Sequence, residues 1–585
     1  MTAPPYTTLD PILFAVVRNA LASAAREMYS TFKRTAMLPI LYEYNDFGMS
    51  LYDDRLNLLA DAPGLPIFLG SLDICIERSL EEIGGREALR PGDVLFNNHP
   101  FLTGGQPPDA ALMKPIFHSD RLIGFAALRA HMGDLGAKNA YPVDSTELFQ
   151  EGTLFPAIKL YDEGRLNDAI VRVIGANSRF PTETVGNVLA AAGALKPCAE
   201  KVVSIVDKYG LDTYYAVVDE VIDQGERATR AAIEQIPDGV YVCEDYMDDD
   251  GVVPGPVRLE VKVTVRGSDI EIDLSNCAGT QVGPINCPWP YTLTSCRFAL
   301  KCITTPDLPA NGGESLPLRV IAPVGSIFNP VPPAPTFLGG GPSLRLVDMI
   351  VRALAPALPD RIPADNAGDL VMIIAYVEDP ETRRLSFFFD AGALGHGATQ
   401  YEDGMNGLIH PIEAGCESLP TEVLESRMPV RKTRFGFITD SGGPGRRRGG
   451  LAAEAEFEFL STGSAVVWAE KAVASTVLGA DGGASPPERN SIVVYPETDR
   501  ELRLGKRAEL ALRPGDRIIA RPSGGGGHGD PLDREPELVV WDVKNGYVSR
   551  EQADSAYGVI LDASGTVDVS ATAAMRATRQ EHRGG

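Results

Sequence analysis

Side chains that can bind a metal ion or move a proton are concentrated in residues 91–152 of the sequence. A Gly-Gly pair is followed by Gln106 and Asp109, and an apolar, strand-like run then leads to His131 and Asp134. A strand fixes the direction of the side chains at its end, whereas a glycine-rich loop lets the backbone come close to a ligand. The residue types and their order therefore indicate a metal or polar catalytic site, without indicating its reaction.

The hydrophobic pattern indicates the elements that would position these residues. Apolar residues recur with helical spacing in residues 10–33, where Asp10 and Pro11 suit a cap and a first turn. Period-two alternation in residues 239–274 is typical of a hairpin. Further strands are expected at residues 94–96, 111–117 and 122–128 and after residue 369, helices at 181–235 (interrupted at Tyr209-Gly210), 286–303, 343–358 and 549–557, an extended segment at 306–335, and a frayed polar tail at 576–585.

Composition and charge exclude some classes of partner. The formal charge of −25 argues against a nucleic acid or an anionic membrane. No apolar run reaches the roughly 18 residues that a membrane-spanning helix needs. The first residues also lack the basic and apolar regions of a secretory signal, so a cytoplasmic protein is expected. The 59 glycines and 45 prolines are not confined to one linker, which predicts a loop-rich fold with extended, polyproline-like segments.

Short motifs occur in a fixed order along nearly the whole chain. Four of them lie in residues 97–134: Asn97-Asn98-His99-Pro100, Gly104-Gly105, Gln106-Pro107-Pro108-Asp109 and His131-Met132-Gly133-Asp134. The others are Asp46-Phe47, Phe149–Gly152, Asn177–Pro181, Gly283–Asn286, Gly339–Gly341, Ser441–Gly445, Gly524–Pro531 and Gly546–Ser549. This ordered set resembles the hydantoinase B/oxoprolinase family, to which components of caprolactamase and of acetone and acetophenone carboxylases are related.

The resemblance implies an α+β, multi-domain fold with barrel-like β-sheets, helices and many Gly/Pro-rich polyproline-type segments. Together with the patterns above it predicts four regions. They are an N-terminal α/β region with the candidate metal or active site (1–238), a β-rich and Pro-rich middle region (239–345), a β-rich region with Gly-rich loops (346–575) and a flexible tail (576–585).

The resemblance also implies a metal site, because family members that bind a metal use the residues that correspond to Asp46, Gln106, Asp109 and His131. Gln106 stands where the family has histidine. An amide oxygen is neutral and a weaker zinc ligand than an imidazole, so this set favours Mn²⁺ or Mg²⁺ over Zn²⁺ if a divalent metal binds. The alternatives are an empty site and a structural hydrogen bond between Asp109 and His131.

The expected catalytic residues are His131 and Asp134. Asp134 could handle a proton or orient the imidazole, since a carboxylate near a histidine fixes its tautomer. It could equally cap the turn at residues 133–136. Other candidates with open roles are His99 (replacement ligand or loop contact), Glu151 (pocket acid or structural partner), and His396 and His528 (substrate contact or none).

The chain shows no nucleotide-binding motif, since Gly524–Gly527 lacks the Gly-Lys-Ser/Thr of a P-loop. The resemblance implies that ATP binds on a hydantoinase A-type partner subunit of actin-like kinase fold, which phosphorylates a carbonyl or bicarbonate oxygen. The present chain would then complete the hydrolysis of a cyclic amide, such as a hydantoin, oxoproline or lactam. The alternatives are a subunit of an ATP-dependent ketone carboxylase that uses bicarbonate, and a non-catalytic assembly subunit.

Overall fold

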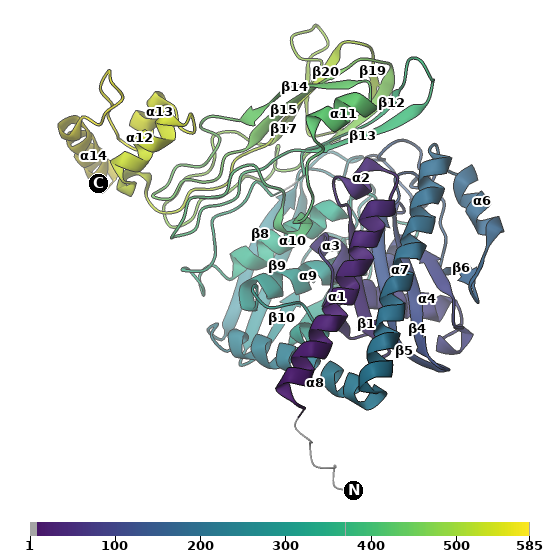
Figure 1. The fold of residues 1–585 in the computed structure, drawn as a ribbon. Helices are drawn as coiled ribbons and strands as arrows, with labels where there is room; N and C mark the ends of the chain where they lie inside the picture. Colours follow the sequence, from purple (N-terminus) through teal and green to yellow (C-terminus); the bar gives the residue numbers. More distant parts are fainter. Residues whose placement is uncertain (1–8, 369, 584–585) are drawn as a thin grey trace.

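The computed structural model describes residues 9–368 and 370–583, which form a large lower body, an upper pair of sheets and a small lateral lobe (Figure 1). The lower body extends from α1 (Pro11–Thr35) to α10 (Gly340–Ala353). The upper sheets lie between β12 (Met372–Glu378) and β20 (Asp516–Arg521) in the sequence, and the lobe contains α12 (Pro536–Lys544), α13 (Arg550–Ser555) and α14 (Val569–Arg583). Among the helices of the described ranges, none is long and apolar enough to cross a membrane.

A seven-stranded antiparallel sheet forms the centre of the lower body. Its strands are β1 (Phe47–Asp53), β2 (Leu58–Asp61), β3 (Val94–Asn97), β4 (Asp109–His118), β5 (Arg121–His131), β6 (Ile158–Asp162) and β7 (Arg165–Leu166), in the order β2-β1-β5-β4-β3-β6-β7. Helices α1, α7 (Pro181–Tyr209) and α8 (Leu211–Ile233) cover one face, and α4 (Leu72–Glu82) covers the other. Because apolar side chains point to both faces, β4 and β5 are buried along most of their length.

A four-stranded sheet completes the lower body. Its strands are β8 (Gly239–Met247), β9 (Val257–Arg266), β10 (Asp269–Asp273) and β11 (Leu318–Ile321), in the order β11-β10-β9-β8. Helix α9 (Trp289–Thr304) packs on α10, which in turn packs on β8 and β9. The remaining helices of this body are α2 (Pro39–Tyr42), α3 (Pro66–Leu69), α5 (Pro100–Thr103) and α6 (Asp168–Ala176), whereas α11 (Thr421–Arg427) packs on the upper sheets.

The two upper sheets are open. They contain β13 (Leu385–Ala391), β14 (Val430–Phe437), β15 (Ala453–Phe459), β16 (Gly463–Trp468), β17 (Ser491–Val494), β18 (Leu502–Leu504) and β19 (Lys506–Leu512), in the orders β13-β12-β16-β19 and β14-β15-β20-β17-β18. Phe388 of one sheet packs against Phe457 and Phe459 of the other. None of the four sheets closes within the described residues, so the expectation of barrel-like sheets is wrong. The sheets can stay open because another sheet or a helix covers each apolar face. The fold is α+β with several open sheets.

Glycine-rich segments join the upper sheets to the lobe as extended chains that run together (Figure 1). Gly525 N donates to Gly450 O at 3.0 Å, and three residues later His528 N donates to Arg447 O at 2.9 Å in the same neighbouring segment. The two residues between them donate to two other segments. This repeat of three residues is the periodicity of a polyproline II helix.

Most elements expected from the hydrophobic pattern are confirmed, including the first helix, whose Asp10 side chain accepts from Ile12 N at 2.9 Å. The C-terminus differs from the expected frayed tail, since α14 remains helical to Arg583. Within it, Arg576 donates to the carbonyl oxygens of Tyr557 at 3.1 Å and Arg534 at 2.7 Å. These bonds hold α14 against the rest of the lobe. Residues 584–585 of the expected tail lie outside the described ranges.

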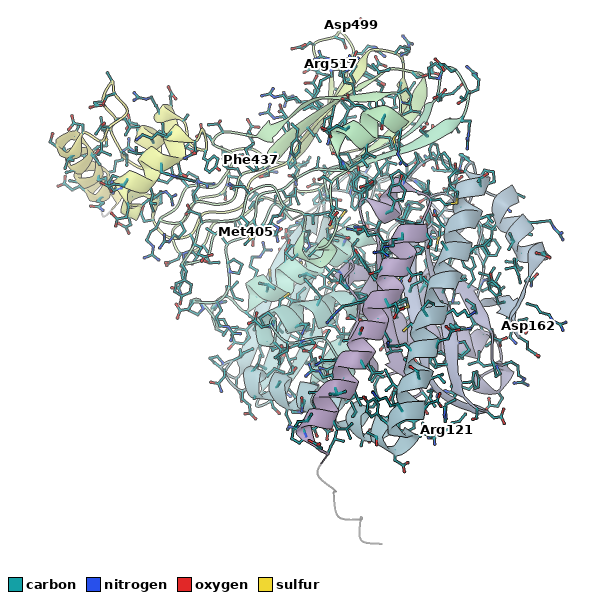
Figure 2. The ribbon with its side chains drawn as sticks, viewed as in Figure 1. Arg121, Asp162, Met405, Phe437, Asp499 and Arg517 are labelled. Atoms are coloured by element: carbon teal, nitrogen blue, oxygen red, sulfur yellow. The ribbon has the colours of Figure 1, made fainter. Side chains whose placement is uncertain are left out.

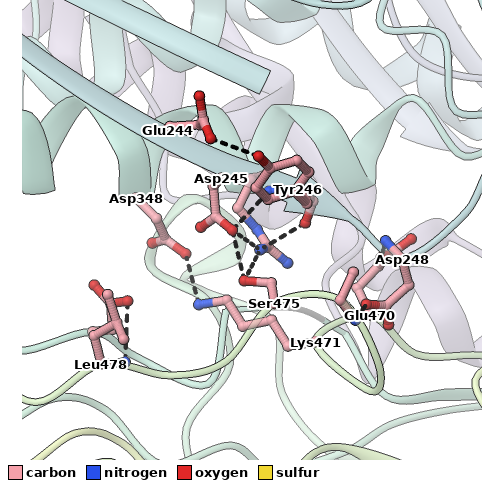
Figure 3. A network of polar contacts seen from close by, with 12 residues as sticks. Glu244, Asp245, Tyr246, Asp248, Asp348, Glu470, Lys471, Ser475 and Leu478 are labelled. Atoms are coloured by element: carbon pink, nitrogen blue, oxygen red, sulfur yellow. Dashed lines mark hydrogen bonds and ion pairs between the residues drawn. The ribbon is translucent and has the colours of Figure 1, made fainter. Parts of the chain in front are cut away.

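Buried polar contacts join the lower body to the loop that follows β16 (Figure 3). Asp348 of α10 pairs with Lys471 at 3.8 Å, and Asp245 of β8 accepts from Ser475 Oγ at 2.6 Å. Asp248 accepts three backbone N–H groups of the same loop, the shortest at 2.6 Å. These contacts fix the upper sheets relative to α10. We call this set of contacts the seam.

Candidate functional site

Strand pairing brings the four predicted metal ligands to one end of the central sheet. In the β4–β5 hairpin Asp109 lies directly opposite His131, so both side chains share a face. Asp46 immediately precedes β1, and its carbonyl oxygen accepts from His131 N at 3.1 Å; Gln106 lies in the turn before β4. Arg121, at the other end of β5, lies at the lower edge of the body in Figure 2, so the site end of the hairpin faces the upper sheets.

Hydrogen bonds link the polar groups of the site. His131 Nδ1 lies 2.8 Å from Asp109 Oδ1, and Tyr291 Oη donates to Asp109 Oδ2 at 3.0 Å. Gln106 Nε2 lies 3.1 Å from His131 Nδ1 and 3.3 Å from Asp109 Oδ1. Because Nδ1 carries at most one proton and the carboxylate is the closer acceptor, we assign that proton to the His131–Asp109 bond. This tautomer leaves the second ring nitrogen, Nε2, able to accept a proton.

Burial and neighbouring charges shift the pKa values of the site. Burial alone would lower the pKa of His131, but the hydrogen bond and the charge of Asp109 outweigh it, so this pKa is raised. Burial also raises the pKa of Asp46, against the opposing effect of His131. His131 therefore binds a proton more readily than an exposed histidine does, which is a property of a general base.

These side chains line a cavity of about 70 Å³ between the lower body and the upper sheets, which we call the site cavity. Aromatic and aliphatic side chains form most of its wall. Tyr141 packs edge-on against Phe337, with 4.6 Å between ring centroids, and is stacked with Trp468 at 6.5 Å. The cavity therefore suits a small ligand with an apolar body.

The ionisable groups of the wall are mostly acidic. Asp46, Asp109 and Glu413 line the site cavity, whereas no lysine or arginine does so within the described part of the chain. One guanidinium, that of Arg129, lies behind the wall, 5.4 Å from the centre of the Tyr291 ring. The cavity itself therefore offers an imidazole but no permanent cation to a ligand.

Two glycines allow the aromatic side chains to reach the cavity. Gly105 has a φ of +86°, and a Cβ there would lie 2.5 Å from Tyr291 Oη and 2.8 Å from Asp109 Oδ2. A Cβ at Gly341 would lie 2.9 Å from Trp468 Cζ2. Either substitution would displace a ring of the wall, because real Cβ contacts are not this short.

Asp134 lies outside the wall of the site cavity. Its Oδ1 accepts from Gly136 N at 3.0 Å and from Arg179 Nη1 at 2.9 Å, and its Oδ2 accepts from Arg179 N at 2.5 Å. This geometry corresponds to the turn-capping alternative. Asp109, not Asp134, has the position from which a carboxylate orients His131.

Glu151 supports the wall from behind. Its carboxylate accepts from Ser145 Oγ at 2.7 Å, from Thr336 N at 2.9 Å and from Phe337 N at 3.0 Å. Since Phe337 belongs to the wall, Glu151 is a structural partner of the cavity and does not line it.

The other histidines singled out in the sequence lie elsewhere. His99 donates its backbone N–H to Asn97 Oδ1 at 3.0 Å. His396 lines a different cavity of about 250 Å³, with Nε2 2.7 Å from Ile409 O. His528 lies among the extended glycine-rich chains. None of the three lines the site cavity.

Sequence reasoning missed the aromatic residues of the wall. A single aromatic residue among apolar neighbours has the pattern of an ordinary core residue, so it carries little signal. The glycines at 105 and 341 were the available indication, since each permits a close approach. The missed residues are Phe68, Tyr141, Tyr291, Phe337, Phe389 and Trp468.

The donor atoms include those that a divalent cation prefers, but their arrangement does not fit a metal ion. The Asp109 carboxylate is hydrogen-bonded to both His131 and Gln106. Across residues 9–368 and 370–583, no three His, Cys, Asp or Glu side chains form a group that could hold a metal. The divalent metal therefore stays a prediction of the sequence, and we derive no chemical step from it.

Comparison with known proteins identifies relatives over the whole chain. Residues 10–531 match the sequence model of the Hydantoinase B/oxoprolinase family. The B subunit of a putative D-/L-hydantoinase from Pseudomonas sp. (strain NS671) is 30% identical over 585 residues, which cover 97% of this chain and 98% of that protein. The beta subunit of caprolactamase from Pseudomonas jessenii is 29% identical over 581 residues, which cover 97% of this chain and 99% of that protein.

Solved structures show the same fold. The crystal structure of ATP-dependent caprolactamase from Pseudomonas jessenii matches with a TM-score of 0.90 and 27% identity, over 98% of this chain and 100% of the matched chain. The nucleotide-free structure of acetone carboxylase also matches with a TM-score of 0.90, over 99% of this chain and 84% of that one. At 19% identity the second match concerns the fold alone.

Proposed function

Because the chain belongs to the hydantoinase B/oxoprolinase family, we propose that it is the subunit of an ATP-dependent enzyme that hydrolyses a cyclic amide: a hydantoin, oxoproline or a lactam. ATP binds on a kinase-like partner subunit, which phosphorylates the carbonyl oxygen of the amide. Water adds to the activated ring carbon, and the C–N bond breaks to leave a free amine and an acyl phosphate. A second water then hydrolyses the acyl phosphate to the ring-opened acid and phosphate. Relatives that are named as the B and beta subunits of their enzymes support a role within an assembly.

The observation that supports hydrolysis is an imidazole held by a buried carboxylate at the edge of an apolar cavity. With Nδ1 bonded to Asp109, His131 Nε2 can accept a proton from the attacking water. The raised pKa of His131 lets the imidazole hold this proton and then return it to the departing ring nitrogen. Tyr291 fixes the second carboxylate oxygen of Asp109.

The acidic wall argues against the carboxylase alternative. Bicarbonate is an anion, and an anion buried beside carboxyl groups without a cation is costly. The described wall of the site cavity presents three carboxyl groups and neither lysine nor arginine. A cyclic amide is neutral before phosphorylation, so its initial binding meets no such penalty.

The reaction is tested with the complex that this chain forms with its partner subunit. ATP turnover is measured with a panel of lactams and hydantoins and, separately, with aryl and alkyl ketones plus labelled bicarbonate. The proposal predicts turnover that depends on the amide and yields the ring-opened acid. Label recovered in a carboxylated ketone, without amide-dependent turnover, would contradict it.

The role of His131 is tested by His131→Gln, which we expect to lower kcat by about 10²-fold or more, because general base catalysis contributes that much. The matched control is His118→Gln. His118 lies at the other end of the same hairpin, where it also pairs with an aspartate, Asp207, at 3.0 Å. Equal loss in both variants would show that the hairpin, not the imidazole, is responsible.

A further inference from the structure

We infer that the site cavity selects cyclic amides whose ring carries no charged group, with Trp468 and Gln106 recognising the two sides of the amide. This inference rests on the proposed hydrolase function and narrows its substrate class. The structure supports it through two unpaired polar atoms, the acidic residues of the wall and the fixed position of the Trp468 indole.

Two residues of the cavity wall each have a buried polar atom without a hydrogen-bond partner in the described part of the chain. They are Nε1 of Trp468, a donor, and Oε1 of Gln106, an acceptor. Buried polar groups in folded proteins nearly always have partners, so unpartnered atoms on two residues that line the same cavity point to a ligand as the missing partner. A ligand in the cavity would therefore have to supply one hydrogen-bond acceptor for Nε1 and one donor for Oε1.

An amide in a small ring supplies both groups. Ring closure holds the amide cis, so that the carbonyl oxygen and the N–H lie side by side. We place the carbonyl oxygen at Trp468 Nε1 and the ring N–H at Gln106 Oε1. A ketone would satisfy the indole but leave the amide oxygen of Gln106 unpaired, which carries a cost when the site is desolvated.

The wall of the cavity disfavours a second charge on the ring. A carboxylate substituent would be buried beside Asp46, Asp109 and Glu413 without a lysine or arginine among the described lining residues. The guanidinium of Arg129 does not line the cavity, and its Nη2 donates to Cys75 Sγ at 2.6 Å. Burial of an unpaired carboxylate is strongly unfavourable. Oxoproline, which carries such a group, is therefore the poorest ligand of the three proposed.

The position of the indole is set by its elements. Trp468 ends β16 and lies opposite Met372 of β12, another residue of the wall. On its other side Gly341 of α10 leaves no room for a Cβ, which would lie 2.9 Å from Cζ2. The indole is thus held between a strand and a helix, as a recognition group requires.

The first experiment varies the ligand and leaves the protein unchanged. Binding of δ-valerolactam, cyclohexanone, 5-oxoproline and the carboxamide of 5-oxoproline to the complex with the partner subunit is measured by calorimetry. The lactam should bind more tightly than the ketone. The carboxamide should bind at least about tenfold more tightly than 5-oxoproline, because only the charge differs substantially between them.

The second experiment uses Trp468→Phe, which keeps an aromatic ring and removes the N–H. We expect lactam binding to weaken by about tenfold, the effect of one lost hydrogen bond in a buried site. Trp541→Phe is the matched control, since Trp541 is an exposed residue of the lobe; lactam binding should not change.

The two proposals fail separately. If 5-oxoproline binds as tightly as its carboxamide, or if Trp468→Phe binds the lactam as wild type does, the present inference is overturned while amide-dependent ATP turnover still supports the hydrolase. If only ketone with bicarbonate stimulates ATP turnover, the hydrolase function itself is overturned. The ligand series on the wild-type complex decides the charge argument even if Trp468→Phe fails to fold.

Discussion

Gln106 determines which chemistry its neighbours can perform. Its amide nitrogen lies within hydrogen-bonding distance of Asp109 and His131 and leaves them paired with each other. The family resemblance puts a histidine at this position, where an imidazole would compete for a metal. An amide is neutral at every pH and a weak ligand for zinc. This single side chain therefore favours a hydrogen-bonded site over a metal site.

We predict that Gln106→His converts the site toward metal binding. With an imidazole in place of the amide, the chain should bind zinc at least about tenfold more tightly, because imidazole is the better zinc ligand. Metal content is measured by mass spectrometry after dialysis against dilute zinc. Gln400→His, outside the site cavity, is the control. Equal zinc content in wild type and Gln106→His would contradict the prediction.

The sequence revealed part of the site because that part is local. Asp109 is the first residue and His131 the last residue of one hairpin, so the pairing of the two strands alone brings them together. Trp468 and Tyr291 belong to distant segments, and nothing in their own neighbourhoods indicates which cavity they reach. Their positions depend on the packing of whole sheets and helices, which local pattern does not determine.

Among the elements, the glycine-rich chains also pack in a way that the local sequence pattern does not determine. The glycine and proline content predicted extended segments, but the sequence did not indicate that they run together or that the sheets stay open. Their contacts are possible only without side chains. A Cβ at Gly525 would lie 2.0 Å from His396 O, and one at Gly450 would lie 1.9 Å from Met405 O. Each glycine therefore fixes a spacing between two backbones.

We predict that Gly525→Ala lowers the free energy of unfolding by about 3 kcal/mol or more, because the clashing atoms belong to the backbone and cannot rotate away. The control is Gly436→Ala in β14, where a Cβ meets nothing within 4 Å. That change should alter stability by less than about 1 kcal/mol. Both values come from urea unfolding. If the Gly525→Ala protein were as stable as the control, the glycines would not be needed for the close spacing of these chains.

On the scale of the whole molecule, the site cavity depends on the seam because its wall comes from both sides. Asp109 and His131 belong to the lower body, whereas Met372 and Trp468 belong to the upper sheets. The seam contacts in Figure 3 hold the two sides at a fixed distance. Loss of a seam contact should therefore reduce stability and also weaken binding in a cavity whose residues are unchanged.

Asp348 is the seam residue that tests this dependence. It accepts from His410 Nε2 at 3.0 Å and pairs with Lys471 at 3.8 Å. Burial alone would raise the pKa of Asp348, but its interactions with His410, including their hydrogen bond, and the charge of Lys471 outweigh burial and hold this pKa at about 2. The carboxylate is thus ionised in the folded protein across the whole physiological range.

We predict that Asp348→Asn lowers the free energy of unfolding by about 3 kcal/mol at pH 7, because it leaves the buried Lys471 ammonium without its carboxylate. The folded pKa lies below the ordinary value of 3.8. The contribution of Asp348 is therefore complete above about pH 4 and is lost as the pH falls from there toward 2. The difference in the free energy of unfolding between wild type and variant should be constant from pH 7 to pH 5 and shrink at pH 3.

The control is Asp219→Asn, which removes an exposed ion pair with Arg55 and should lower the free energy of unfolding by less than about 1 kcal/mol. Urea unfolding at the three pH values measures both variants, and lactam binding at pH 7 tests the link to the cavity. A difference that grows as the pH falls would contradict the assigned ionisation, and undiminished lactam binding in a destabilised Asp348→Asn would show that the cavity does not depend on the seam.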